Sequence, residues 1–141
     1  MRIVRVLVIE DSLTIRAILE SILGRHPDIQ IIGLASDVEE AKHYLEERQP
    51  DVITLDLNLP GIDGMDFLEE LAQGPHAPVL VVSSSTQDKS AKSKDTIKAG
   101  AFACFDKARL VHDAPRFVKV LRRAADERLK ALGLLTETAE A

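Results

Sequence analysis

The chain has 141 residues, 45% hydrophobic and 29% charged, which fits one globular domain and excludes a disordered or fibrous chain. Its formal net charge of −5 argues against binding nucleic acid through a broad basic surface, so we expect no direct nucleic-acid partner. The single cysteine, Cys104, cannot form an internal disulfide, and no apolar run approaches the ~18 residues of a membrane span. We therefore expect a cytoplasmic protein without membrane insertion.

Apolar runs typical of strands alternate with helical patterns from the start of the chain. The first run, Ile3 to Ile9, precedes a helix that His26-Pro27 ends. The apolar residues of this helix recur at intervals of three and four, which predicts one buried face. They are Ile15, Ile18, Leu19, Ile22 and Leu23.

The second run spans Ile29 to Ala35. Ser36, with Glu39 three positions on, predicts the cap of the next helix. The third run, Val52 to Leu55, ends at Asp56. The inner stripe of the helix after the second run consists of Val38, Ala41 and Leu45, and that of the helix after the third run of Met65, Leu68 and Leu71.

The fourth run, Val79 to Val82, is followed by four hydroxyl residues, Ser83 to Thr86. The helix predicted over residues 88–99 has Ile97 as its only large apolar residue, so we expect it to be the least firmly packed. The fifth run, Phe102 to Phe105, precedes a last helix that Gly133 ends. The stripe of that helix consists of Phe117, Val118, Leu121, Ala125, Leu129 and Leu132.

Five strand and helix pairs joined by short connections predict an α/β domain with a doubly wound, five-stranded parallel sheet. Parallel strands need crossovers, and helices then cover both faces of the sheet. If the strand order is 2-1-3-4-5, the first and third strands are neighbours. We expect a domain over residues 1–132, and a tail or linker start over 133–141.

Chemistry-bearing residues follow four of the predicted strands. Ligands of open parallel sheets bind beyond the carboxyl ends of the strands, where the strand order reverses. Glu10-Asp11 and Asp56 would meet there. Two like charges ~4 Å apart repel by roughly 4 kcal/mol at an effective dielectric of 20, so three carboxylates need a cation or raised pKa values. Ser83 and Asp106-Lys107 end the neighbouring strands.

Oxygen ligands without a nearby His or Cys favour a hard ion, and Mg²⁺ is the expected cofactor. Glu10 and Asp11 are predicted metal ligands together with Asp56, and the backbone carbonyl of Asn58 is a further candidate. Asp56 is also the expected nucleophile, because aspartate can form an acyl phosphate. The Ser83 hydroxyl and Lys107 would face the phosphoryl oxygens.

Each feature alone has a simpler interpretation. Glu10-Asp11 would be a turn with a helix cap, Ser83 would satisfy a backbone group, and Lys107 would be a solvated lysine. We interpret Cys104 as a small residue of the hydrophobic core. All of these residues occur together, each at the end of a predicted strand, and this combination favours a shared functional site over the separate interpretations.

The full set resembles the receiver domain of bacterial two-component response regulators. The resemblance covers about residues 3 to 125. It is carried by Glu10-Asp11-Ser12, by Asp56-Leu57-Asn58-Leu59-Pro60-Gly61-Ile62-Asp63-Gly64, by Ser83 and by Lys107. The stretch Asp51 to Ser85 is most similar to the receiver half of chemotaxis methylesterases, and we expect no esterase half within these 141 residues.

The resemblance implies a flavodoxin-like receiver fold with the strand order 2-1-3-4-5, and a phosphorylation-dependent switch. A histidine kinase or histidine phosphotransfer protein would donate a phosphoryl group to Asp56 with Mg²⁺ bound, and hydrolysis would reset the switch. Ser83 and Lys107 would move toward the phosphoryl oxygens and change the surface that a downstream protein target binds. Such a receiver is not primarily an enzyme, since it only phosphorylates and dephosphorylates itself.

Two positions depart from the family pattern. Ala108 stands where most receivers have a proline after the lysine, so the cis peptide usual at that position does not carry over from the family. Cys104 stands where an aromatic residue is usual. Strand alternation predicts that Phe102 lies on the same face as Cys104 and could replace that ring.

Two other functional classes compete with this interpretation. A Mg²⁺-dependent phosphatase with an aspartate nucleophile would need a second acid two positions beyond the nucleophile, where this chain has Asn58. A nucleotide or flavin module would typically carry a glycine-rich phosphate loop, and the chain has neither common form.

Overall fold

The protein alternates strands and helices along its whole described length. The structure, a computed structural model, describes residues 2–61, 63–73, 76–84 and 89–133, and of residues 89–93 the backbone alone. The elements are β1 (Val4–Ile9), α1 (Leu13–Gly24), β2 (Ile29–Ala35), α2 (Val38–Glu47), β3 (Val52–Leu55), α3 (Gly64–Ala72), β4 (Val79–Ser83), α4 (Lys89–Lys98), β5 (Ala103–Asp106), the short 3₁₀ helix η1 (Lys107–Arg109) and α5 (Ala114–Ala131).

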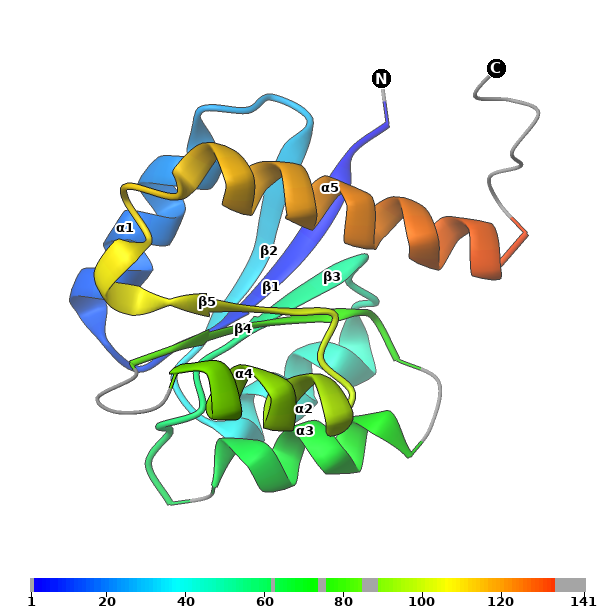
Figure 1. The fold of residues 1–141 in the computed structure, drawn as a ribbon. Helices are drawn as coiled ribbons and strands as arrows, with labels where there is room; N and C mark the ends of the chain where they lie inside the picture. Colours follow the sequence, from blue (N-terminus) through cyan, green and yellow to red (C-terminus); the bar gives the residue numbers. More distant parts are fainter. Residues whose placement is uncertain (1, 62, 74–75, 85–88, 134–141) are drawn as a thin grey trace.

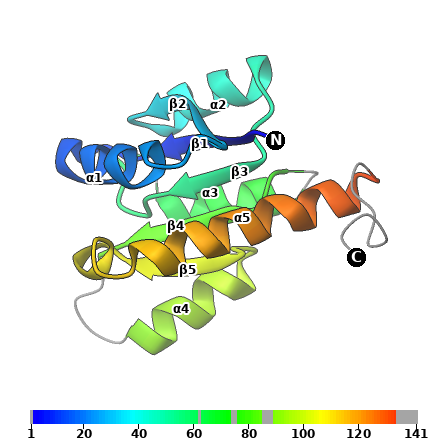
Figure 2. The ribbon, with the colours of Figure 1, turned by 90° about the horizontal axis from the view of Figure 1, so that it is seen from above.

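The five strands form one parallel sheet in the order β2-β1-β3-β4-β5. This order confirms the doubly wound α/β fold expected from the sequence. Figures 1 and 2 show α1 and α5 on one face of the sheet and α2, α3 and α4 on the other. Because β1 and β3 are neighbours while their connections leave in opposite directions, the strand order reverses between them.

Two hydrophobic clusters hold the helices to the sheet. Val6 and Val8 of β1 belong to the cluster under α1 and α5, whereas Leu7 and Ile9 belong to the cluster under α2 and α3. All four side chains are fully buried. Burial on both faces explains why the strands read as continuous apolar runs rather than as alternating ones.

The cap of α2 differs from the sequence prediction. Asp37, not Ser36, is the N-cap residue, and its carboxylate accepts a hydrogen bond of 2.8 Å from the Glu40 N–H. The Glu40 carboxylate in turn accepts a bond of 3.2 Å from the Ser36 N–H. The helix starts at Val38, so Ser36 lies one residue too early to cap it. The capping position is thus shifted by one residue, and the Glu40 carboxylate returns to the Ser36 N–H rather than to the N–H of the N-cap residue, as it would in a capping box.

The two helices nearest the C-terminal end of the chain pack differently. Five residues of α5 are buried, and Gly133, with a φ of +74°, ends the helix as expected. In the described part of α4 the buried side chain is Thr96, and Ile97 is 47% exposed. Ile97 therefore does not anchor α4 to the sheet. None of the described helices combines the length and apolarity needed to cross a bilayer.

Candidate functional site

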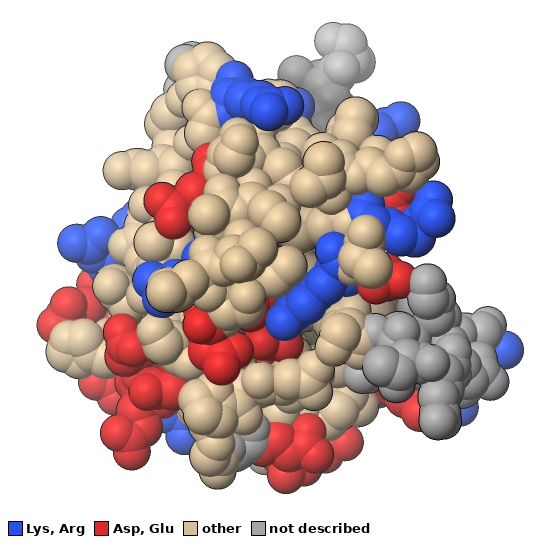
Figure 3. Space-filling model, turned by 90° about the vertical axis from the view of Figure 1, so that its left-hand side faces the viewer, with Lys and Arg blue, Asp and Glu red and all other residues tan. Residues whose placement is uncertain are grey.

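Acidic side chains lie at the edge where β1 and β3 end side by side. The Asp56 N–H donates to the Ile9 carbonyl over 2.9 Å, which continues the sheet ladder to the site. Glu10 and Asp56 are each 1% exposed, and Asp11 is exposed. One carboxylate oxygen of each of the three lies within 4.8 Å of the others. Figure 3 faces this edge and shows acidic side chains gathered near the middle of the surface. The structure thus brings together the three carboxylates that the sequence predicts.

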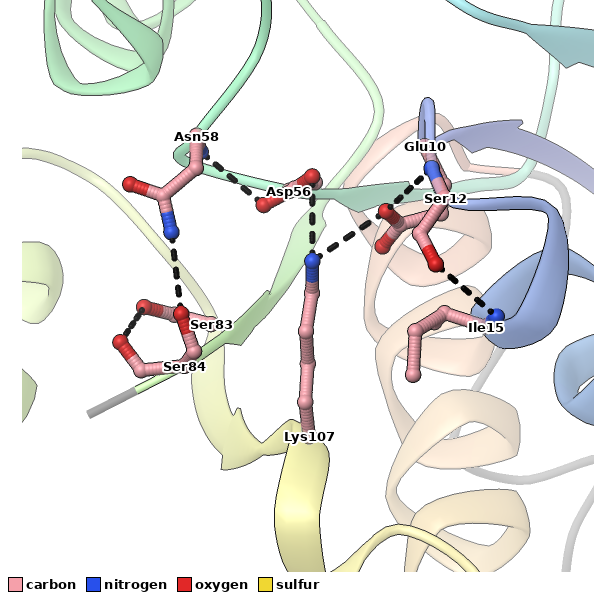
Figure 4. Close-up of polar contacts among 8 residues, drawn as sticks. All are labelled: Glu10, Ser12, Ile15, Asp56, Asn58, Ser83, Ser84 and Lys107. Atoms are coloured by element: carbon pink, nitrogen blue, oxygen red, sulfur yellow. Dashed lines mark hydrogen bonds and ion pairs between the residues drawn. The ribbon is translucent and has the colours of Figure 1, made fainter. Parts of the chain in front are cut away.

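Lys107 reaches into this group from the end of β5. Its Nζ lies 3.1 Å from Glu10 Oε2 and 3.1 Å from Asp56 Oδ2 (Figure 4). The Lys107 side chain is only 15% exposed. A single cation therefore sits between two buried carboxylates, and it offsets part of their mutual repulsion.

The two oxygens of Asp56 have different surroundings. Oδ1 accepts a hydrogen bond of 2.9 Å from the Asn58 N–H. Oδ2 lies within ion-pair distance of Lys107 but receives no well-directed hydrogen bond from the described residues. Glu10 shows the same asymmetry, since its Oε2 accepts from the Ser12 N–H over 3.1 Å while its Oε1 has no partner among them. Two buried oxygens thus remain available to a ligand.

The carboxyl groups differ in charge state because of these contacts. Burial, with a smaller contribution from Asp56, raises the pKa of Glu10 to about 7. Burial also pushes the pKa of Asp56 upward, but the hydrogen bond from the Asn58 N–H, the neighbouring Glu10 carboxyl group and the positive charge of Lys107 outweigh it and hold that pKa below its ordinary value. The pKa of Lys107 is raised, because its two carboxylate partners outweigh its burial. Asp56 is accordingly the ionised carboxylate of the pair and Lys107 its counter-ion.

Ser83 ends β4 on the side of the site opposite Glu10. It is 2% exposed, and its hydroxyl donates to the Ser84 carbonyl over 3.3 Å. The Asn58 side-chain amide donates to the Ser84 hydroxyl over 3.1 Å, which joins the loops after β3 and β4 (Figure 4). Ser83 therefore lies near the site with its hydroxyl engaged in its own loop. Ser85 and Thr86, the other expected hydroxyls of the series, lie outside the described residues.

Asp106 is not one of the clustered carboxylates. Its Oδ1 accepts a hydrogen bond of 3.0 Å from the Ala108 N–H and caps η1. The peptide bond between Lys107 and Ala108 is trans, as are the others in the described residues.

The expected replacement of the missing aromatic ring by Phe102 is wrong. Phe102 packs against the hydrophobic cluster under α1 and α5, whereas Cys104 packs against the cluster under α2 and α3. The two side chains lie on opposite faces, because β5 begins only at Ala103 and strand alternation does not extend back to Phe102.

Two positions that the sequence analysis left without a role shape the site. Ser12 caps α1 through its hydroxyl, which accepts from the Ile15 N–H over 3.3 Å, and its own N–H holds Glu10. A serine directly before an amphipathic stripe is a recognised cap signal. A Cβ on Gly64 would lie 2.4 Å from the Leu57 Cα, so only glycine allows α3 to start this close to the loop after Asp56.

The chain matches known proteins over nearly the whole described fold. The family model for the response regulator receiver domain matches residues 6–127. Among solved structures, the response regulator domain of Thermotoga maritima CheB has a TM-score of 0.79 and 31% sequence identity. That match covers 88% of this chain and 97% of the other.

Curated relatives are longer proteins. A protein-glutamate methylesterase/protein-glutamine glutaminase of Caulobacter vibrioides is 38% identical over 104 residues, which is 74% of this chain and 30% of the relative. One from Pseudomonas syringae pv. tomato is 35% identical over 141 residues, 96% of this chain and 39% of the relative. The chain thus spans about a third of the length of these relatives.

Proposed function

The chain belongs to the response regulator receiver domain family, and on that basis we propose that Asp56 accepts a phosphoryl group from a histidine kinase or a histidine phosphotransfer protein in the presence of Mg²⁺. The family supports phosphorylation-dependent signalling in two-component systems, with chemotaxis proteins among the relatives. What we propose beyond the family assignment is the phosphoryl donor, the bound metal and the role of each residue.

The observation that carries the proposal is the environment of Asp56 Oδ2. This oxygen is buried, lies 3.1 Å from Lys107 Nζ and accepts no directed hydrogen bond from the described residues. The other oxygen is held by the Asn58 N–H, which fixes the orientation of the carboxylate. An ionised, oriented carboxylate beside a cation is suited to attack phosphorus.

The donor set fits Mg²⁺. Glu10, Asp11 and Asp56 supply carboxylate oxygens close together, and Glu10 Oε1 and Asp56 Oδ2 are buried without a hydrogen-bond partner among the described residues. Hard oxygen ligands of this kind suit Mg²⁺. We assign these three residues and the Asn58 backbone carbonyl as the ligand candidates. When bound, the ion would neutralise charge on the phosphoryl oxygens.

In the proposed reaction an Asp56 oxygen forms a bond to phosphorus as the phosphorus–nitrogen bond to the donor histidine breaks, and the imidazole nitrogen keeps that electron pair. Lys107 pairs with the transferred oxygens. The Ser83 hydroxyl leaves the Ser84 carbonyl and donates to a phosphoryl oxygen, which moves the loop after β4. Water later hydrolyses the acyl phosphate. The changed loop is then the surface for a downstream protein target.

The proposal assigns a switch rather than an enzyme to this chain. Any methylesterase or glutaminase activity, which is named for the relatives, would belong to residues outside this sequence. We assign residues 1–132 to the receiver and 133–141 to a tail or linker start, of which 134–141 lie outside the described residues. A cytoplasmic location is part of the same proposal.

The direct test is phosphorylation by acetyl phosphate with Mg²⁺, followed by intact-mass measurement and acid stability. The wild type is expected to gain one phosphoryl group, and Asp56→Asn none. Asp66→Asn, which alters an exposed acid of α3, serves as the matched control and should label like the wild type. Equal labelling of wild type and Asp56→Asn would refute the assignment, and turnover of p-nitrophenyl phosphate would favour the phosphatase alternative.

Metal binding has a separate test. Calorimetric titration with Mg²⁺ should show weaker binding to Asp11→Ala than to the wild type, because one carboxylate ligand is lost. Asp66→Asn again controls for the change in net charge. An unchanged affinity in Asp11→Ala would remove Asp11 from the ligand set.

A further inference from the structure

A groove of about 880 Å³ lies between the C-terminal end of α1 and α5. Ile22, Arg25 and His26 line it on the α1 side, and α5 with the residues just before it lines the other side. The helix α1 begins at Leu13, next to the acidic site. At ~1.5 Å per residue, Arg25 is roughly 18 Å further along the helix axis. The α1 side of the groove therefore lies well away from the three carboxylates of the acidic site.

The lining changes from apolar to basic along the chain from the end of η1 into α5. Apart from His112, the earlier lining residues are apolar, namely Val111, Ala114, Pro115 and Val118. Lys119, Arg122 and Arg123 follow them on α5. The groove thus has an apolar end, formed by the first set of residues, and a basic end, formed by the second.

Three cations of the groove have no acidic partner. Arg25, Lys119 and Arg123 are exposed, and none of them forms an ion pair with a described residue. The one acid in the lining, Asp126, is paired with Arg2. Lys119 and Arg123 are one turn apart on α5, and like charges at this spacing repel each other. A bound anion would relieve this repulsion.

The basic end is held in shape by the remaining cation, Arg122. Its guanidinium group donates to the two carboxylate oxygens of Asp28 over 3.0 and 2.8 Å. Its Nη2 also lies 3.2 Å from Nδ1 of His26. These contacts join α5 to the turn between α1 and β2, so the groove is formed before any ligand binds. A preformed site avoids the cost of ordering its residues on binding.

We propose that this groove binds a nucleoside polyphosphate. The phosphates would pair with Arg25, Lys119 and Arg123 through charge-assisted hydrogen bonds. The nucleoside would cover the apolar end, where the exposed ring of His112 offers a flat surface on which the base can stack. The ligand site is separate from the proposed phosphoryl acceptor, Asp56, and does not depend on it.

The shape and lining of the groove favour this class over other anions. Small-molecule sites have volumes of roughly 300 to 1,000 Å³ and combine apolar lining with a few polar groups. A lipid bilayer is flat and would not fill a concave groove, and inorganic polyphosphate would leave the apolar end uncovered. The chain has no glycine-rich phosphate loop, so side chains rather than backbone N–H groups would hold the phosphates.

The test uses ATP as the probe, with inorganic tripolyphosphate and adenosine as its two parts. Each is titrated into the unphosphorylated full chain in EDTA without Mg²⁺, and backbone amide shifts are followed by NMR. We expect ATP to shift residues 22–26 and 111–123. It should bind about tenfold more tightly than tripolyphosphate at low salt, because the apolar end adds contacts with the nucleoside, and more weakly at high salt.

A charge variant tests the basic end. Arg25→Gln/Lys119→Gln/Arg123→Gln should weaken ATP binding by at least about tenfold, because charge-assisted contacts are lost. The matched control is Lys42→Gln/Lys94→Gln/Lys98→Gln, which makes the same change in net charge at exposed residues outside the groove. Since distant surface charges are screened, the control should weaken ATP binding by less than about threefold.

A ring variant tests the apolar end. His112→Ala should weaken ATP binding about fivefold, because the stacking surface is lost. The affinity for tripolyphosphate should stay unchanged, since that probe has no base. All the substituted side chains are exposed, and the thermal unfolding midpoints of the variants verify that they fold.

Several outcomes would overturn the proposal. These are equal affinity for ATP and tripolyphosphate, amide shifts confined to other faces, or equal weakening by the two triple variants. Binding of phosphatidylglycerol vesicles through the same cations without binding of ATP would also contradict it. Asp56 takes no part in these titrations, so their failure is distinguishable from failure of Asp56 labelling by acetyl phosphate.

Discussion

Two sets of ion pairs in this molecule have similar distances but very different exposure to solvent. In the site, Lys107 Nζ lies 3.1 Å from a carboxylate oxygen of Glu10 and of Asp56, and the three side chains are 15%, 2% and 1% exposed. On the surface, Arg122 lies 2.8 Å from Asp28, with side chains 40% and 25% exposed. Burial, not distance, decides how much each contact matters.

The comparison shows that removing one charge should destabilise the buried group much more than the surface pair. Water screens the Arg122–Asp28 pair, so its removal leaves solvated charges. Removal of one charge from the buried group instead leaves the others without compensation. The buried charges are kept in place by backbone groups, namely the N–H of Ser12 and the N–H of Asn58. Three predictions sharpen this contrast.

The largest effect is expected for Lys107→Met, which keeps the length of the side chain but removes its charge. Without metal, two carboxylates would share a buried site, and we expect the free energy of unfolding to fall by about 3 to 5 kcal/mol. Urea denaturation with and without Mg²⁺ measures it. Mg²⁺ should restore part of the loss, since it supplies positive charge to the same oxygens.

Lys42→Met is the matched surface control. Lys42 pairs with Glu70 at 3.1 Å, the same distance, but the two side chains are 48% and 53% exposed. We expect a loss of at most about 0.5 kcal/mol. If the two lysine variants were equally destabilised, burial would not distinguish the two kinds of contact.

The next effect concerns pH. The pKa of Glu10 is about 7 in the folded protein, against an ordinary value of 4.5 for a glutamate in the unfolded chain, so as pH rises the unfolded chain loses this proton at lower pH than the folded protein does. The contribution of Glu10 to the free energy of unfolding is therefore at its full size below pH 4.5, and it is lost as pH rises to about 7. We expect the free energy of unfolding to fall by up to about 3 kcal/mol between those two values in Mg²⁺-free buffer.

Denaturation curves at several pH values, compared between the wild type and Glu10→Gln, isolate this effect. The variant should lack the decline. The lowered pKa of Asp56 has the opposite sign, because stability from it is lost only as pH falls below its ordinary value of 3.8. The two groups therefore act in separate pH ranges. An identical pH profile in wild type and variant would contradict the shift assigned to Glu10.

The smallest effect is expected for Asp28→Asn at the surface pair. Arg122 lowers the pKa of Asp28, but the pair is open to solvent, so we expect a loss of about 1 kcal/mol or less that shrinks in high salt. Thermal or urea denaturation at two salt concentrations measures it. A salt-independent loss as large as that of Lys107→Met would contradict the contrast.

Much of the site was predictable because it depends on topology. Asp56 ends a buried strand, Glu10-Asp11 end its neighbour, and Lys107 ends a third, so a parallel sheet in the expected order brings them to one edge. The residue types alone then indicate a hard cation and a phosphoryl group. Alternation and connection length predicted a doubly wound parallel sheet, whereas its strand order came from the resemblance to the receiver family.

Other features depended on differences of one residue or on tertiary packing. Ser36 and Asp37 are both good caps, and only the true start of α2 selects Asp37. The face of the sheet on which the Phe102 side chain lies depended on the residue at which β5 begins. The hydrogen bond between Asn58 and Ser84 joins two loops that no local pattern relates. The groove beside α1 likewise arises only when α1 and α5 pack on the same face.

The close approach of Gly64 to Leu57 has a consequence for how this family of switches can fail. Leu57 lies between Asp56 and Asn58, so a methyl group at position 64 would displace the peptide that orients the Asp56 carboxylate, the proposed phosphoryl acceptor. Under the proposed function, such a mutation would impair phosphorylation of Asp56 while every acid and the lysine stayed in place. A survey of homologous chains that scores only charged residues would count that protein as intact.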